Sequence, residues 1–132
     1  MSRSESATPL AKVRGLGSAH HGGQHWLDER FTSVTLVLLS LWLLFSLVML
    51  PALDRGTIGE WLSSAWGAVP MALLIITAFK HGLDGLKVIV DDYVHEEGSR
   101  IGLHFVLTMA AIAGDAVSLF ALAKIAFGAP AA

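Results

Sequence analysis

Three long apolar segments divide the chain, and polar residues separate them. The first covers residues 33–53 and contains no charged side chain; the second covers about 66–90 and the third 101–127. A helix needs about 20 apolar residues, each rising ~1.5 Å, to cross the hydrocarbon core of a membrane. The pattern therefore predicts three membrane-spanning helices.

The remaining residues are predicted to form connections and termini. Residues 54–64 and 91–100 are predicted to be polar connections between the spans. Residues 1–24 lack the apolar run that a cleaved signal requires, and their Ser, Gly, Ala and His content predicts a flexible cytoplasmic arm. A membrane domain over 25–128 and a short tail over 129–132 complete the predicted organisation.

Composition supports a membrane class. Apolar residues make up 54% of the chain and charged residues only 15%, and the net charge is -2. Such a chain is predicted to be an all-α integral membrane protein without a nucleic-acid partner. It has no cysteine, so disulfides, thiolate zinc sites and iron–sulfur ligation are excluded, and any metal must be held by histidine or carboxylate.

Basic residues predict the orientation of the spans. Most lie before the first span or near the second connection, namely Arg3, Lys12, Arg14, Arg30, Lys87 and Arg100. The opposite side has only Arg55 and Lys124. Cytoplasmic segments carry the excess of Lys and Arg. We therefore expect a cytoplasmic N-terminus and a periplasmic C-terminus.

The second span contains several ionisable residues, which are costly inside a bilayer and usually face protein or a cofactor. Lys80, Asp84 and Lys87 are spaced to neutralise one another on one helix face. Asp115, in the third span, is expected to bond to Lys80 or to a partner chain. Because of its ionisable residues, the helix of the second span is predicted to pack against another subunit.

His81 is the first candidate for chemistry. It lies ten residues from Asp91, hence about 15 Å from the end of its helix. A buried imidazole needs a partner, which is either haem iron or a hydrogen-bonding group on another helix. Gly85, one turn further on the same face, leaves room for a flat macrocycle or for close helix packing.

His104 is the other intramembrane histidine. It is only about 6 Å deep, so its depth differs from that of His81 by about 9 Å. The two are therefore not expected to hold one haem between them. If His81 binds haem, a second polypeptide is predicted to supply the sixth ligand.

Asp92 and Tyr93 follow His81 by eleven and twelve residues, about 16–18 Å along the helix, which places them at the membrane surface. The phenol can donate to a quinone carbonyl, with acids and imidazoles nearby as proton sources, or it is simply an interfacial aromatic residue. Arg30 suits either a haem propionate or a topogenic role. The N-terminal histidines, His20, His21 and His25, read as solvated.

These residues together resemble a known family. The segment from His81 to His95 is similar to the second helix of the small hydrophobic membrane anchor of succinate dehydrogenase (respiratory complex II), the D-type cytochrome b556 anchor. In that family a histidine is followed by glycine and then by Asp-Tyr at the spacing of Gly85, Asp92 and Tyr93. Residues 30–33, Arg-Phe-Thr-Ser, resemble the Arg-x-Thr-Ala start of the family's first helix.

The resemblance implies roles for single residues. His81 would be an axial ligand of haem b, shared with a second anchor, and Gly85 would lie against the haem. Tyr93 would hydrogen-bond the quinone beside Asp92, and Arg30 would lie near the haem propionates.

The resemblance also implies partners and a location. These are a flavoprotein subunit with FAD, an iron–sulfur subunit with its clusters, and a second three-helix cytochrome b anchor. The complex would reduce quinone with electrons from succinate, linking the tricarboxylic acid cycle to the respiratory chain. It would lie in the bacterial inner membrane or the mitochondrial inner membrane, and this chain alone would catalyse nothing.

Three alternatives stay open on the sequence. The first is the anchor of a quinol:fumarate reductase, which runs the same architecture in reverse. The second is a noncatalytic membrane scaffold or transporter subunit, which predicts no haem. The third is a small self-sufficient b-type cytochrome, which the unequal depths of His81 and His104 disfavour.

Overall fold

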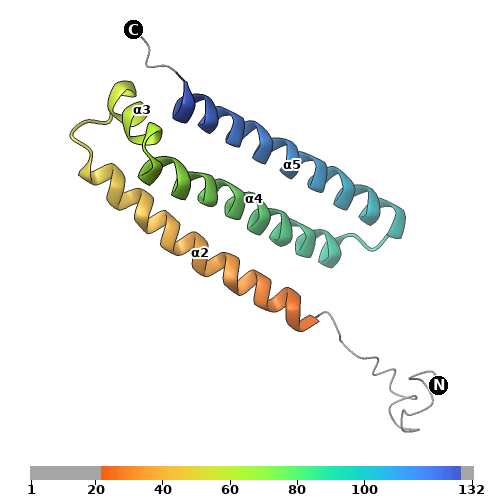
Figure 1. Cartoon of the computed structure of the whole chain (residues 1–132). Coiled ribbons are helices and arrows are strands. Elements are labelled where there is room, and N and C mark those ends of the chain that lie inside the picture. Colours follow the sequence, from red (N-terminus) through yellow and green to blue (C-terminus); the bar gives the residue numbers. More distant parts are fainter. Residues whose placement is uncertain (1–21, 129–132) are drawn as a thin grey trace, which may run out of the picture.

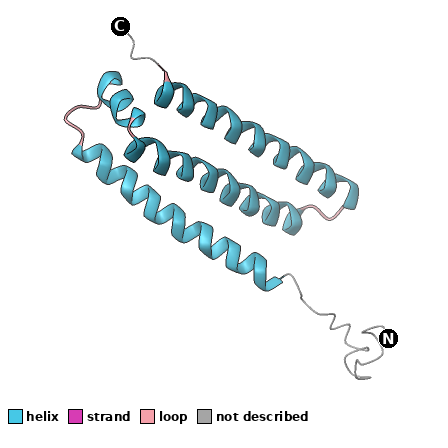
Figure 2. Cartoon of the chain, in the orientation of Figure 1, coloured by secondary structure: helices cyan, strands magenta, loops and turns pink. Residues whose placement is uncertain are grey.

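A computed structural model describes residues 22–128, all of whose regular structure is helical (Figures 1 and 2). The helices are α2 (Gly22–Met49), α3 (Arg55–Ser63), α4 (Ala65–Tyr93) and α5 (Glu97–Phe127). The all-helical class is thereby confirmed. The predicted arm over residues 1–24 lies outside the described residues except for the first turn of α2, and the tail over 129–132 lies outside them entirely.

The three long helices form an open layer with α4 in the middle (Figure 1). Helices α2 and α5 each run antiparallel to α4 along opposite sides of it. Within the described chain α2 and α5 make no contact with each other. The layer is therefore not closed into a bundle, and both of its faces remain open.

Most large apolar side chains lie on these open faces. Among the described apolar residues only Leu62 and Leu122 are less than a tenth exposed. Soluble monomers rarely expose such continuous apolar surface. Helices α2 and α5 are long and apolar enough to cross a membrane, and α4 meets this test only together with α3, to which it is bent by 89°. The described chain thus has two clear candidate spans, or three if the bent pair is one.

The first helix differs from the predicted span at both ends. It begins at Gly22, eleven residues before the predicted start at Ser33, and ends at Met49 instead of Leu53. The early end has a local cause, because Leu50 precedes Pro51 and the ring of proline disfavours helical geometry in the residue before it.

The polar connection over residues 54–64 contains a helix that the sequence pattern does not predict, α3 (Figure 2). Asp54 is its N-cap, and its carboxylate accepts hydrogen bonds from the backbone N–H groups of Gly56 and Thr57 at 2.8 and 3.0 Å. These contacts, those from Thr57 above all, hold the pKa of Asp54 below its usual value. The cap starts the helix, and Leu62 anchors it by burial.

The bend between α3 and α4 depends on Ser64 and Gly67. Ser64 is the C-cap of α3 and the N-cap of α4, and its hydroxyl accepts from the backbone N–H of Gly67 at 3.1 Å. Gly67 is buried, and a Cβ there would collide with the carbonyl group of Trp61, whose carbon would lie 2.8 Å away. A larger residue therefore cannot occupy this position without moving backbone.

The connection between α4 and α5 is short because Glu96 caps α5. Its carboxylate accepts from the backbone N–H groups of Gly98 at 3.1 Å and Ser99 at 2.6 Å. Hydrogen bonds from Ser99, first from its side chain and then from its backbone, together with the Gly98 N–H, hold the pKa of Glu96 below its ordinary value. Within the polar connection predicted over 91–100, only residues 94–96 are therefore not helical.

We predict that Gly67→Ala destabilises the protein, because the added methyl group meets backbone that cannot rotate away. Overpacking of this kind costs roughly 1–3 kcal/mol. Thermal unfolding of the purified protein is the measurement. Gly59→Ala is the matched control, since a Cβ at Gly59 has no atom within 4 Å. Equal unfolding temperatures for the two variants would contradict the role given to Gly67.

We also predict a pH-dependent contribution from Glu96. Because its pKa is lowered in the folded protein, the ionised cap stabilises the fold above the unfolded value of about 4.3 and loses this effect as pH falls through the lower folded value. The unfolding temperature of wild type should exceed that of Glu96→Gln at pH 7, and the difference should shrink below about pH 4. Glu97→Gln removes a neighbouring charge and is the control. A difference that persists unchanged into acid would refute the ionised cap.

Candidate functional site

His81 lies in the second half of α4 and faces α2. Its Nδ1 atom is 2.9 Å from the hydroxyl oxygen of Thr32, and the contact is partly buried. The other ring nitrogen, Nε2, has no hydrogen-bond partner among the residues that the structure describes. The imidazole is therefore fixed through one nitrogen while the second stays available as a ligand.

Thr32 also contacts its own helix. Its hydroxyl oxygen lies 2.9 Å from the carbonyl oxygen of Asp28 and 3.1 Å from that of Glu29. Threonine in a helix commonly bonds back to a carbonyl one turn earlier. The side chain that holds His81 is thus itself held by α2.

Open space borders His81 on the surface of α4. Gly82 and Gly85 are exposed, and a Cβ at either position would have no neighbouring atom within 4 Å. Neither glycine is therefore required here for packing of the described helices. A flat group can approach the helix backbone at this level.

The charged residues around His81 follow the predicted pattern in part. Lys80 Nζ and Asp84 Oδ2 form an ion pair at 2.8 Å, whereas Lys87 takes part in none among the described residues. The expected bond between Lys80 and Asp115 does not form. Oδ1 of Asp115 is buried without a hydrogen-bond partner in the described chain.

Asp92 and Tyr93 lie at the end of α4, at a different level from His81. Twelve residues separate Tyr93 from His81, which corresponds to about 18 Å along the helix. Both side chains are exposed, and that of Tyr93 is 79% exposed. The structure thus presents the phenol and the carboxylate on an open surface and does not bring them against the imidazole.

Asp91 faces α5 instead. Its Oδ1 lies 3.1 Å from Nε2 of His104 and 4.0 Å from Nε of Arg100. The direction of the His104 contact is not that of a hydrogen bond, so the attraction is electrostatic and depends on a protonated imidazole. His104 is therefore placed beside Asp91, ten residues and about 15 Å from the level of His81.

Arg30 stacks on its own helix. Its guanidinium carbon lies 5.3 Å from the centre of the Trp26 ring, within the range of a cation–π contact. It precedes Thr32 by two residues, so the two side chains leave α2 about 200° apart. The structure places Arg30 near the level of His81 but on another side of α2.

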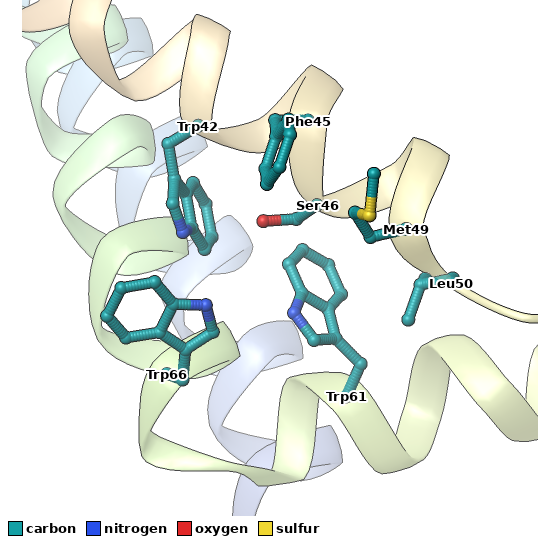
Figure 3. Close-up of a pocket in the computed structure, with 7 residues that line it drawn as sticks. All are labelled: Trp42, Phe45, Ser46, Met49, Leu50, Trp61 and Trp66. Atoms are coloured by element: carbon teal, nitrogen blue, oxygen red, sulfur yellow. The ribbon is translucent and has the colours of Figure 1, made fainter.

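A separate apolar cavity lies at the opposite end of the layer, next to α3 (Figure 3). Its volume is about 260 Å³. The rings of Trp42 and Trp61 stack there with centroids 5.5 Å apart, and the hydroxyl of Ser46 points into the space. Its lining is uncharged: Trp42, Phe45, Ser46, Met49, Leu50, Trp61 and Trp66. The cavity suits an apolar group and has no feature of a redox or acid–base site.

Sequence reasoning missed the partner of His81. Thr32 belongs to the Arg-Phe-Thr-Ser segment that resembles the start of a known family's first helix, and this resemblance is the sequence feature that points to it. The pairing of Asp91 with His104 was also missed. Among the described residues no group of three or more His, Cys, Asp or Glu side chains forms a metal site. His81 can therefore supply one ligand to a metal whose other ligands come from elsewhere.

Comparison with known proteins identifies one family. Residues 4–114 match the family model for the succinate dehydrogenase/fumarate reductase transmembrane subunit. The match covers most of the chain, including the whole of α2, α3 and α4.

Curated relatives point the same way. The chain is 34% identical to the succinate dehydrogenase hydrophobic membrane anchor subunit of Rickettsia bellii over 85 residues, which are 64% of this chain and 68% of the relative. It is 27% identical to the subunit of the same name from Paracoccus denitrificans over 122 residues, 92% of this chain and 94% of the relative. The succinate dehydrogenase membrane anchor subunit of Reclinomonas americana is 29% identical over 94 residues, 69% of this chain and 78% of the relative.

Proposed function

Because the chain belongs to the family of succinate dehydrogenase and fumarate reductase transmembrane subunits, as a hydrophobic membrane anchor of succinate dehydrogenase, we propose that it helps to form a haem b site and a quinone site in a succinate:quinone oxidoreductase. Its partners would be a flavoprotein subunit with FAD, an iron–sulfur subunit and a second cytochrome b anchor. The relatives above carry the name of succinate dehydrogenase, which favours succinate oxidation over fumarate reduction.

The haem assignment rests on the hydrogen bonding of the two ring nitrogens of His81. Its Nδ1 is held by Thr32 at 2.9 Å, and its Nε2 is left without a partner in the described chain. Metal-binding histidines are typically oriented in this way, through a hydrogen bond at the second ring nitrogen. The open surface at Gly82 and Gly85 leaves space for a macrocycle beside the imidazole.

The sixth ligand would come from the second anchor subunit. His104 lies beside Asp91, about 15 Å along α4 from the level of His81. The two imidazoles are therefore too far apart to hold one haem between them. The open faces of the layer give a partner helix access to the His81 level.

Tyr93 and Asp92 would contribute to the quinone site. An exposed phenol at the end of a membrane helix can donate a hydrogen bond to a quinone carbonyl. Asp92 would supply an acid near water for the protons that quinone reduction consumes. Arg30 would pair with a haem propionate after leaving its contact with Trp26, because charge-assisted bonds to carboxylate are the stronger interaction.

The bound haem would supply one-electron redox chemistry, and this chain would supply position and electrostatics. His81 holds its place in α4 through Thr32. Tyr93 orients the quinone, and the acidic end of α4 keeps protons close to it. The chain alone would not oxidise succinate.

The proposed topology has three spans, with α4 crossing the bilayer and α3 lying against its surface. The excess of basic residues supports a topology in which the N-terminus and the α4–α5 connection would lie in the cytoplasm and the C-terminus in the periplasm. The host would be the bacterial inner membrane or its mitochondrial equivalent.

The first test is a reduced-minus-oxidised visible spectrum of the purified complex. We expect a low-spin b-type signal in wild type that is lost or becomes high-spin in assembled His81→Ala, because the iron loses an axial nitrogen. His104→Ala is the matched control and should keep the low-spin signal. Absence of haem from wild type, or an unchanged signal in His81→Ala, would disprove the axial role.

The second test concerns Tyr93. Tyr93→Phe removes only the hydroxyl, and loss of one hydrogen bond to quinone should lower quinone reductase kcat/KM by about tenfold. Succinate oxidation with a water-soluble artificial acceptor should be unchanged, since that assay bypasses the anchor. Full quinone reductase activity in the variant would remove Tyr93 from the site.

A further inference from the structure

The hydroxyl group of Thr32 has one hydrogen and three polar neighbours. Its oxygen lies 2.9 Å from His81 Nδ1, 2.9 Å from the carbonyl oxygen of Asp28 and 3.1 Å from the carbonyl oxygen of Glu29. A carbonyl oxygen can only accept, whereas an imidazole nitrogen donates or accepts according to its tautomer. The single hydrogen of Thr32 must therefore go to one of these neighbours, and that choice decides the tautomer of His81.

The two carbonyl groups are not equally available. The Glu29 carbonyl already accepts the Ser33 hydroxyl at 2.7 Å as well as the backbone N–H of Ser33 in α2. Its two lone pairs are thus in use. The Asp28 carbonyl has only the helical N–H of Thr32 besides the closer hydroxyl contact, so it is the better acceptor for Thr32.

With its hydrogen donated to Asp28, the oxygen of Thr32 can only accept from His81. The short contact then requires a proton on Nδ1, and the lone pair of the neutral ring lies on Nε2. We infer that Thr32 is a positioning residue that keeps the proton of His81 on Nδ1 and makes Nε2 the stronger ligand for haem iron. This inference rests on the proposed function, which supplies the iron.

The arrangement has an electronic effect besides its geometric one. An oxygen that donates its own hydrogen to a carbonyl is a better acceptor, because linked hydrogen bonds polarise one another. A hydrogen bond accepted from Nδ1–H raises the basicity of the metal-binding nitrogen. A more basic ligand favours the ferric over the ferrous state, so Thr32 should lower the midpoint potential of the haem.

Redox titration of the purified complex tests this assignment. Thr32→Val keeps the branched shape and removes the hydroxyl, and it should raise the haem midpoint potential above that of wild type. Thr32→Ser should restore the wild-type potential. The matched control is Thr35→Val. The Thr35 hydroxyl donates to the carbonyl of Phe31, one turn earlier in α2, at 2.8 Å and makes no hydrogen bond to His81 in the described chain.

The haem midpoint potentials of these variants decide whether the Thr32 hydroxyl acts on His81. A raised potential in Thr32→Val with rescue by Thr32→Ser and no shift in Thr35→Val supports the inference. An unchanged or lowered potential in assembled Thr32→Val overturns it while leaving the haem proposal intact. If Thr32→Val fails to assemble, Thr32→Ala and Thr32→Ser, which differ only in the oxygen, are compared instead. A higher haem midpoint potential in Thr32→Ala than in Thr32→Ser supports the inference, and equal potentials overturn it. A wild-type complex without b-type haem overturns the proposed function and this inference together.

Discussion

The hydrocarbon interior of a membrane offers no hydrogen-bond partner, and a polar side chain there must find one within protein. This constraint accounts for the central position of α4, which carries more ionisable residues than either α2 or α5. Lys80 pairs with Asp84 within the helix, His81 is hydrogen-bonded to Thr32 on α2, and Asp91 lies beside His104 on α5. The polar side chains of α4 thus find partners on both neighbouring helices. A helix at the edge of the layer has a neighbouring long helix on one side only.

The open layer sets the limits of what the chain can do alone. Closed bundles bury their apolar residues among their own helices, but here both faces of the layer expose them. Oδ1 of Asp115 and Nε1 of Trp42 are buried without a partner in the described chain. These two atoms lie inside the described chain, so they are not part of its open surface. The exposed apolar side chains are the part that lipid or a second polypeptide can cover.

The sequence predicted the features that follow from composition and helical spacing: the apolar segments, the Lys80–Asp84 pair and the separation in level between His81 and His104. It did not predict α3, because Arg, Gly and Glu between two apolar runs are typical of a loop, and only the Asp54 cap and the burial of Leu62 favour a helix. The Thr32–His81 contact joins residues 49 positions apart. Such a contact depends on the register of two packed helices, which spacing within one segment does not determine.

The bend at Gly67 has a consequence for the electrical behaviour of the membrane. If α3 lies flat on one surface, α4 enters the bilayer at Ala65, and His81 lies sixteen residues further, about 24 Å across a hydrocarbon core of about 30 Å. The imidazole then belongs to the leaflet nearer to Tyr93. The preceding stretch of α4, from Trp66 to Phe79, contains no ionisable side chain. That half of the helix would insulate the proposed haem and quinone sites from the opposite compartment. Quinone reduction would then draw its protons from one side of the membrane only.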